Sequence, residues 1–515
     1  MNTFMTNLLL NSQSPSGTAK EQVPPFAGYQ SQFVQGNFDG WYARGDSNVS
    51  LSVSDEALHI TGRSAAWHSL GRAFPLKKGQ KYRFSFAVYQ QEAAWAEIII
   101  SLHHSHNGVE SSENLVRAAT EKGVWATIKG TFTPEEYDDY SLYVETVGLP
   151  NMDFSIKDVV VEPDDITYDL NLPSLADVFA PYFDFGCAVN GNQVNDRERM
   201  QFCAHEFNIM THENELKPSR VLDLDTARKL VQEDETAVAV QFALAKPLLD
   251  FCLANGIKVH GHTLVWYNAT PDVFFREGYR EDGPYVSREV MLGRMENYIR
   301  LVMAYMKENY PGLIVSWDVV NEAISICEEE LRDCTWLRVV GPDYIHRAFE
   351  YARKYAPEGV KLYYNDYYTH YEPKLTGICN LLDSLIAEGN IDGYGFQGHY
   401  FFATPGHYVL SSPSPEEIRN AMMRISAKGL RLRVSELDVG IEDQSDENLS
   451  FQTCKYRDFM KVFMEFAEQM DAVQLWGVTD DRSWRSKEYP LLFDQKAQPK
   501  PAFYGVLDAA QGKEK

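Results

Sequence analysis

Apolar and polar residues alternate along the first third of the chain with the period of a half-buried strand. The clearest alternating runs are 51–54, 81–89 and 153–161. Several such short strands within residues 35–162 predict a β-sandwich. Residues 1–34 are rich in Ser, Gln and Pro, and we expect them to form a polar tail.

A different pattern begins near residue 170 and continues to about residue 510. Eight short apolar runs have the length and composition of parallel strands buried on both faces. They are 183–189, 207–211, 258–265, 314–320, 361–365, 393–399, 430–436 and 473–478. Helical periodicity is clearest at 236–254, 290–309, 344–355 and 448–469. This alternation predicts a (β/α)8 TIM barrel, so the expected fold is a multi-domain chain with a β-sandwich followed by a barrel.

Length and charge agree with two globular domains and narrow the choice of ligand. The chain has 515 residues and a formal net charge of 48 − 73 = −25. A field of that sign repels phosphate backbones, so we expect no nucleic-acid partner. No run approaches twenty consecutive apolar residues, so we expect no membrane span. A neutral ligand is compatible with this charge.

Cysteine usage and the first residues say less about function. The seven cysteines show no C-x-x-C spacing, so we expect neither a zinc site nor a redox motif. Cys327 and Cys334 either pair across a loop or remain free thiols. The N-terminus lacks a basic segment, and its apolar run at 8–10 is too short for a signal peptide. Intracellular action and export with a signal outside this sequence both stay open.

Two glutamates follow or end predicted barrel strands, where the chemistry of such barrels is found. Glu322 follows the run 314–320, and Glu436 ends the run 430–436. They could be ordinary rim charges paired with Arg or Lys. However, carboxylates on two strands across the barrel mouth also suit glycoside hydrolysis, which needs two carboxyl groups flanking the sugar bond.

Seven motifs occur along the barrel in an order that strengthens the second interpretation. They are 211–218 (THENELKP), 261–266 (GHTLVW), 317–322 (WDVVNE), 365–367 (NDY), 397–399 (QGH), 434–438 (VSELD) and 476–484 (WGVTDDRSW). Together they resemble glycoside hydrolase family 10, the endo-β-1,4-xylanases. The resemblance implies retaining hydrolysis of internal bonds in xylan by double displacement, without a cofactor. It also implies xylan and xylo-oligosaccharides as binding partners, and extracellular action.

The resemblance assigns roles to individual residues. Glu322 matches the family's general acid/base, and Glu436 matches the nucleophile. Asn321 matches the residue that binds the sugar 2-hydroxyl. His399 and Asp438 match the pair that holds the nucleophile, and a histidine donating to Glu436 would lower the pKa of that carboxyl. Glu322 must then be the carboxyl whose pKa is raised for proton donation.

Nine further positions match residues that bind substrate in the family. On the glycone side they are Glu213, Asn214 and Lys217. At the floor and over the −1 subsite they are His262, Trp266, Trp476 and Trp484. Near the acid/base and the first aglycone subsite they are Gln397 and Tyr367. Tryptophan suits sugars because a pyranose ring offers an apolar face.

The chain also departs from the family pattern. The family commonly has His and Gln where this sequence has Tyr267 and Ala269. Glycone affinity and the pH optimum are the properties that these two changes would affect. Insertions near 274–285 and 325–340 are expected to reshape the rim of the cleft.

The N-terminal sandwich resembles the family 22 carbohydrate-binding modules over residues 37–162. The motifs are 38–45 (FDGWYARG), 62–68 (GRSAAWH) and 142–146 (LYVET). The resemblance implies a sugar cleft lined by Arg44, Trp67, Tyr143 and Glu145. The cleft tyrosine of the family falls near Ser112, so one aromatic wall is missing. The module family can carry a structural calcium ion, whose ligands the sequence does not place.

Two rival functions and one rival site remain open at this stage. The same barrel could cut another β-1,4-glycan, such as cellulose or a mixed-linkage glucan. A non-catalytic polysaccharide-binding protein is disfavoured, because both glutamates and their supporting residues are present. The run His103-His-Ser-His106 could suggest a metal site, but alternate strand residues face opposite sides and no carboxylate cluster completes the set. We therefore expect no metal there. The oligomeric state stays open.

Overall fold

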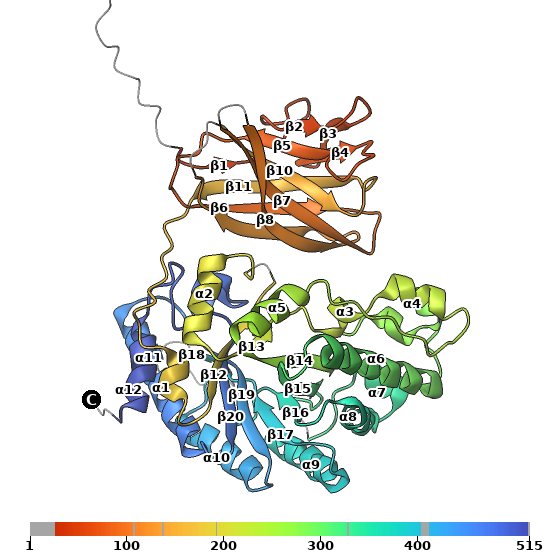
Figure 1. The fold of residues 1–515 in the computed structure, drawn as a ribbon. Coiled ribbons are helices and arrows are strands. Elements are labelled where there is room, and N and C mark those ends of the chain that lie inside the picture. The colour runs from red at the N-terminus through yellow and green to blue at the C-terminus, as the bar shows by residue number, and fades with distance from the viewer. Residues whose placement is uncertain are drawn as a thin grey trace, which may run out of the picture.

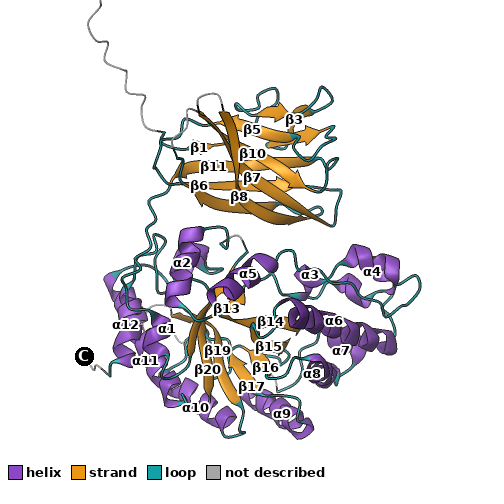
Figure 2. Ribbon diagram, viewed as in Figure 1, coloured by secondary structure: helices purple, strands orange, loops and turns teal. Residues whose placement is uncertain are grey.

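The computed structural model describes residues 26–106, 109–135, 139–191, 193–326, 329–402 and 411–512. An N-terminal β-sandwich packs above a barrel whose helices surround a parallel sheet (Figures 1 and 2). The predicted fold class is therefore confirmed. Within the described ranges, no helix combines the length and the apolarity needed to cross a membrane.

Two antiparallel sheets form the sandwich. The first sheet has the order β3-β4-β11-β6-β9 with β1 on β11, and the second has the order β2-β5-β10-β7-β8. The strands are β1 (Tyr29–Gln30), β2 (Tyr42–Arg44), β3 (Ser50–Ser54), β4 (Ala57–Thr61), β5 (Ser69–Ala73), β6 (Tyr82–Tyr89), β7 (Trp95–His106), β8 (Val109–Glu121), β9 (Ala126–Phe132), β10 (Asp139–Val147) and β11 (Phe154–Pro163). Their inward-facing residues, such as Phe86, Ile100 and Leu142, are fully buried between the sheets.

The sandwich begins earlier than the sequence suggested. Residues 1–34 were expected to be a polar tail, but β1 pairs with β11 and Phe33 is 4% exposed. The ring of Phe26 also contacts Phe74, with centroids 6.1 Å apart. These aromatic residues bury apolar surface, which holds residues from 26 onward against the domain. Residues 1–25 lie outside the described part.

Eight parallel strands close the barrel. They are β12 (Asp184–Val189), β13 (Ile209–His212), β14 (Lys258–Trp266), β15 (Ile314–Asn321), β16 (Lys361–Asp366), β17 (Gly393–Phe396), β19 (Arg431–Ile441) and β20 (Met470–Leu475). Each pairs with its neighbour in sequence order, and pairings of β17 with β19 and of β12 with β20 complete the circle. The carboxyl ends of all eight strands therefore meet at one rim.

Helices cover the outside of the barrel (Figure 2). They are α1 (Leu175–Phe179), α2 (Arg197–Glu206), α3 (Pro218–Val221), α4 (Leu224–Leu230), α5 (Lys246–Asn255), α6 (Arg288–Asn309), α7 (Thr335–Val340), α8 (Tyr344–Tyr355), α9 (Glu372–Glu388), α10 (Pro415–Ser426), α11 (Asp446–Glu465) and α12 (Pro501–Ala510). Four short 3-10 turns lie on the rim loops at η1 (Asp272–Phe275), η2 (Glu277–Tyr279), η3 (Asp480–Arg482) and η4 (Ser486–Glu488).

Two predicted elements differ from the structure. The helix expected at 236–254 begins only at Lys246, because Pro247 fits the first turn of a helix but not its interior. The strand expected at 393–399 divides into β17 and β18 (His399–Phe402). Gly398, with φ of +83°, turns the chain between them and brings His399 beside β19.

Ion pairs connect the sandwich to the barrel. The Lys81 ammonium lies 2.5 Å from the Glu198 carboxylate on α2, and Lys496 lies 2.8 Å from Asp165 in the connecting segment. Glu121 at the end of β8 pairs with Arg220 on α3. The sandwich is thus held on the side of the barrel rim formed by the loops after β12 and β13 (Figure 1).

Candidate active site

The two predicted catalytic glutamates lie at the barrel rim on β15 and β19. Glu322 directly follows β15, has a left-handed backbone (φ +57°) and is 9% exposed. Glu436 lies within β19 and is 5% exposed. Non-glycine residues in this backbone region cost free energy and are concentrated at functional sites. The strained turn after Asn321 aims the Glu322 side chain over the barrel mouth.

Glu322 has the environment of a protonated acid. Burial raises the pKa of its carboxyl, and Asp366 and Glu436 raise it further, while the hydrogen bond from Gln397 acts in the opposite direction. The Gln397 side-chain amide donates to Glu322 Oε1 at 2.9 Å, and that of Asn321 donates at 3.3 Å. A buried carboxyl with a raised pKa keeps its proton to a higher pH than a free glutamate does, as a general acid requires.

Glu436 has the opposite environment. Burial by itself would raise the pKa of its carboxyl, but the neighbouring His262 and His399 lower it below the usual value. His399 Nε2 lies 3.1 Å from Glu436 Oε2, and its Nδ1 lies 2.8 Å from Asp438 Oδ2. Although burial opposes its charge, Asp438 and Glu436 raise the pKa of His399 to about 10. A protonated His399 thus holds Glu436 as a carboxylate.

Asn365, whose role the sequence did not reveal, connects the two glutamates. Its side-chain amide donates to Glu436 Oε1 at 2.7 Å and to Asn321 Oδ1 at 3.0 Å. Asn365 lies in β16, in register with Asn321 of β15, and reaches Glu436 across Gly395 of β17. A Cβ atom at Gly395 would lie 2.3 Å from Asn365 Oδ1, so this glycine provides the space. The motif at 365–367 was the only signal for this residue.

The three predicted glycone residues form one cluster after β13. Lys217 Nζ donates to Asn214 Oδ1 at 3.0 Å and lies 5.0 Å from the centre of the Trp266 ring. The Glu213 carboxyl is hydrogen-bonded by Asn190 and Asn214, and burial followed by Glu215 raises its pKa to about 7. Charged, amide and aromatic groups therefore surround one space, which suits a sugar with hydroxyl edges and an apolar face.

His262 and the two predicted tryptophans lie beside the nucleophile. His262 Nδ1 lies 2.9 Å from Asp318 Oδ2, and its ring packs 5.3 Å from Trp476, which is 6% exposed. Trp484 donates its indole N–H to Asp438 at 2.9 Å but leaves 59% of its surface exposed. Trp476 therefore forms a wall, while Trp484 offers an open aromatic face at the cleft.

The two departures from the family pattern have different consequences. The Tyr267 hydroxyl lies 3.4 Å from Glu322 Oε2, so a hydrogen-bond donor stands beside the acid/base candidate. Ala269 is 9% exposed and offers no polar side chain. Only the replacement of glutamine by Ala269 therefore removes a polar group from this loop.

The insertion at 325–340 contributes a residue that the sequence analysis missed. Arg332 Nε donates to the Glu322 backbone carbonyl at 3.0 Å, and its guanidinium lies 4.5 Å from the Tyr267 ring. A second guanidinium nitrogen donates to the Tyr367 hydroxyl at 2.8 Å. Arg332 thus connects the Glu322 backbone with Tyr367, the residue predicted for the first aglycone subsite, and no motif pointed to Arg332. Of the two alternatives for these cysteines, the free thiol is the one found at Cys334, which is buried, and Cys327 lies outside the described residues.

The four predicted cleft residues of the sandwich lie together. Arg44 lies 3.5 Å from the Glu145 carboxylate, and its guanidinium stands 5.6 Å from the Trp67 ring and 5.1 Å from the Tyr143 ring. Trp67 is 51% exposed. Tyr42, which the sequence did not single out, shares a hydrogen bond of 2.5 Å with Tyr143.

Two further expectations for the sandwich concern the serine in place of the cleft tyrosine and the run of histidines at 103–106. Ser112 pairs with His103 across β7 and β8, and the His103 ring packs 4.2 Å from Tyr143. Serine thus stands at the edge of the cleft. His104 points to the opposite, buried side, and the His106 side chain lies outside the described part. Within that part, no group of three or more His, Cys, Asp or Glu side chains could hold a metal ion.

Comparisons with known proteins agree with this geometry. Residues 174–509 match the family model described as glycosyl hydrolase family 10, and residues 27–151 match one described as a carbohydrate binding domain. Endo-1,4-beta-xylanase A of Thermotoga neapolitana is 32% identical over 95% of this chain and 47% of its own length. This chain therefore spans about half the length of that curated relative.

Solved structures are similar to this chain over its whole length or over part of it. The Clostridium thermocellum endo-1,4-beta-D-xylanase 10B CBM22-1-GH10 modules, complexed with xylohexaose, are 28% identical with a TM-score of 0.62, covering 93% of this chain and 96% of that one. The intracellular xylanase TsXylA of Thermoanaerobacterium saccharolyticum, complexed with xylotriose, is 33% identical with a TM-score of 0.58, covering 66% and 100%. The chain belongs to glycosyl hydrolase family 10 and carries an N-terminal carbohydrate-binding domain.

Proposed function

We propose that this protein is a retaining endo-β-1,4-xylanase, with Glu322 as acid/base and Glu436 as nucleophile. The observation that carries the proposal is the opposite environment of the two glutamates. Burial raises the pKa of Glu322, whereas His262 and His399 overcome burial to lower the pKa of Glu436. Paired carboxyls with separated pKa values are the acid and the nucleophile that glycoside hydrolysis requires.

In the first step, a Glu436 carboxylate oxygen attacks the anomeric carbon of the sugar in the −1 subsite. The glycosidic C–O bond breaks, and Glu322 transfers its proton to the departing oxygen. The products are a covalent glycosyl ester on Glu436, an ionised Glu322 and a released aglycone alcohol. Loss of its proton makes Glu322 negative, and Gln397 and Tyr267 are placed to donate hydrogen bonds to it.

In the second step, Glu322 accepts a proton from water while the water oxygen attacks the same anomeric carbon. The ester bond to Glu436 breaks, and the sugar leaves with its original configuration. Both carboxyls return to their starting state, so the two steps call for no cofactor. The Asn321 side chain hydrogen-bonds to Glu322, that of Asn365 hydrogen-bonds to Glu436, and the two asparagines are bonded to each other.

The substrate proposal rests on the cleft and on the relatives. Lys217, Glu213 and Asn214 offer hydrogen bonds to hydroxyls, and Trp484 offers an aromatic face. Related family members carry xylanase names, and two have been solved with xylo-oligosaccharides bound. We therefore assign xylan and xylo-oligosaccharides as ligands of this chain.

For the sandwich, we propose membership in family 22 of the carbohydrate-binding modules and binding of xylan at the Arg44 and Trp67 cleft. Exposure of Trp67 and the convergence of Arg44, Tyr143 and Glu145 support this function. Ser112 leaves one side of the cleft without an aromatic wall, so we expect weak binding. A structural calcium ion in the module stays a prediction, which thermal melting of the protein with and without a chelator tests. Export from the cell also stays a prediction.

A substrate panel tests the proposed activity. Reducing ends are measured after incubation with soluble xylan, carboxymethylcellulose and mixed-linkage glucan. We expect fastest release from xylan. Faster cleavage of carboxymethylcellulose would replace the xylanase assignment by another β-1,4-glycanase. Binding of xylan without any cleavage would instead favour the polysaccharide-binding protein.

A further inference from the structure

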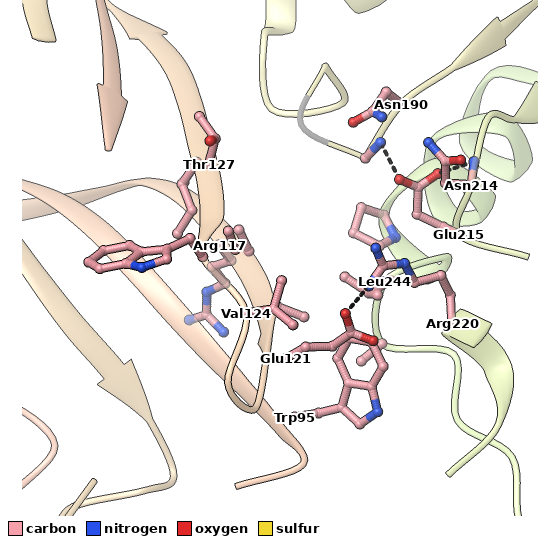
Figure 3. Close-up of a pocket in the computed structure, with 18 residues that line it drawn as sticks. Trp95, Arg117, Glu121, Val124, Thr127, Asn190, Asn214, Glu215, Arg220 and Leu244 are labelled. Carbon is pink, nitrogen blue, oxygen red and sulfur yellow. Dashed lines mark hydrogen bonds and ion pairs between the residues drawn. The ribbon is translucent and has the colours of Figure 1, made fainter. Parts of the chain in front are cut away.

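A pocket lies between the sandwich and the barrel, next to the predicted glycone cluster (Figure 3). Its volume is about 260 Å³. The sandwich contributes Trp95, Glu121 and Val124, and the barrel contributes Asn190, Asn214 and Arg220. Pockets for small molecules usually range upward from about 300 Å³, so this one lies just below that range and could hold at most one sugar unit.

The pocket adjoins the proposed substrate site and shares a lining residue with it. Asn214 lines the pocket and also accepts the hydrogen bond from Lys217 at 3.0 Å. Asn190, which lies near Asn214 on the barrel side of the pocket (Figure 3), hydrogen-bonds to Glu213 together with Asn214. The same two amides therefore face both the glycone cluster and the interdomain space.

The wall between these spaces is shaped by Glu215. Its carboxylate accepts from the backbone N–H of Gly191 at 2.8 Å and from that of Asn214 at 3.2 Å. The bond from Gly191 joins the loop after β12 to the loop after β13, and the bond from Asn214 lies within the second loop (Figure 3). The pocket edge on the barrel side is thus fixed before a ligand arrives, which reduces the entropy lost on binding.

The chemistry of the pocket suits a neutral pyranose. Figure 3 shows the Trp95 ring in the pocket below the ion pair between Glu121 and Arg220. An indole face can stack on the apolar side of a sugar ring, and the carboxylate, the guanidinium and the amides of Asn190 and Asn214 can bind its hydroxyls. Because the two nearest charges neutralise each other, the pocket does not select for a charged ligand.

From the shared Asn214 and from the contact of Asn190 with Glu213, we infer that the interdomain pocket is a distal glycone subsite, which binds the non-reducing end of a long β-1,4-linked pyranose chain while the scissile bond lies at Glu322. The inference rests on the proposed function. It assigns a direct part in substrate binding to the sandwich edge, separate from the Arg44 and Trp67 cleft. The occupant is the same neutral chain that fills the active site, because Asn190 and Asn214 face both spaces.

Kinetics of Trp95→Ala on a long and a short substrate test this inference. With xylohexaose we expect KM to rise about tenfold with kcat nearly unchanged, because the lost binding energy is equal in the ground state and the transition state. With xylotriose we expect both constants to match the wild type, because the inference requires a chain long enough to reach the pocket from the scissile bond. Tyr504→Ala is the matched control, since Tyr504 is 50% exposed and its helix α12 lies far from the sandwich (Figure 1). This variant should have the wild-type KM and kcat with both substrates.

The outcomes separate this inference from the proposed function. Equal loss on both substrates would mean that Trp95 only supports the structure, and no loss on either would mean that the pocket is empty space; each result overturns the inference. If the wild type cleaves neither substrate, the proposed function fails. In that case the Kd of xylohexaose for the wild type and for Trp95→Ala, measured by calorimetry, tests the pocket alone. We expect about tenfold weaker binding to Trp95→Ala, and equal binding would refute the inference.

Discussion

Removal of the Asn365 side chain should raise the pKa of the nucleophile. Asn365 is fully buried, and its amide donates to Glu436 at 2.7 Å. A hydrogen bond to a charged group contributes about 1.5–3 kcal/mol, and one pKa unit corresponds to about 1.4 kcal/mol. Asn365→Ala should therefore raise the pKa of Glu436 by about one to two units. Because the nucleophile must be ionised, the acidic limb of the kcat/KM profile should move to higher pH by the same amount.

The assay is kcat/KM on an aryl xylobioside between about pH 3 and pH 9. Gly395→Ala gives an independent perturbation, since its methyl group would lie 2.3 Å from Asn365 Oδ1 and displace that side chain. It should shift the acidic limb in the same direction. Asn309→Ala, at the exposed end of α6, is the matched control. If the acidic limb of Asn365→Ala lies within about 0.3 pH units of the wild type, the hydrogen bond from Asn365 does not stabilise the Glu436 carboxylate by the expected amount. That result would refute the prediction.

Three further predictions concern the acid/base and the module. Tyr267→Phe removes a donor from the Glu322 carboxylate, so the pKa of Glu322 should rise and the alkaline limb of kcat/KM should move up by a few tenths of a pH unit; a downward shift would contradict this. Glu322→Ala should slow substrates with poor leaving groups most, because these need protonation; equal loss with aryl and sugar leaving groups would count against the assignment. Arg44→Ala should weaken retention on insoluble xylan at least threefold, with xylotriose turnover unchanged as the control; full retention would remove the module cleft from the account.

The parts of the fold that depend on local pattern could be predicted from the sequence. The eight barrel strands were found because strands buried on both faces form apolar runs. The start of α5 was misplaced by ten residues, at 236 instead of Lys246, although Pro247 carried the correct signal. The start of the sandwich was placed too late because Phe26 and Phe33 stand singly in a polar segment, and only tertiary packing shows that they are buried.

In the candidate site, too, some residues could be predicted from the sequence and others only from the tertiary structure. Residues within ordered motifs, such as Glu322 and Glu436, could be named from the sequence because the resemblance carries their positions. The bridging geometry of Asn365 could not, because it depends on the register of β15 and β16 and on the missing side chain of Gly395. Arg332 could not be found either, since it lies in an insertion and reaches the site only through the tertiary fold.

The interdomain pocket could not be predicted from sequence motifs. Trp95 and Arg220 are 125 residues apart in sequence and belong to separate domains, and no motif includes both. Only the docking of the sandwich on the loops after β12 and β13 brings them to one pocket. Predictions of substrate length from the barrel alone would therefore omit the sandwich edge.

The stereochemistry of the first products shows whether the reaction is retaining and whether Glu436 is its nucleophile. Xylohexaose is hydrolysed by the wild type and by Glu436→Ala, and the anomeric protons of the first products are followed by NMR. The account predicts β-anomers first from the wild type, no turnover by the variant, and an α-glycosyl azide when azide replaces the missing carboxylate. First products with the α configuration, or turnover by Glu436→Ala without azide at the wild-type rate, would contradict Glu436 as the nucleophile of a double displacement.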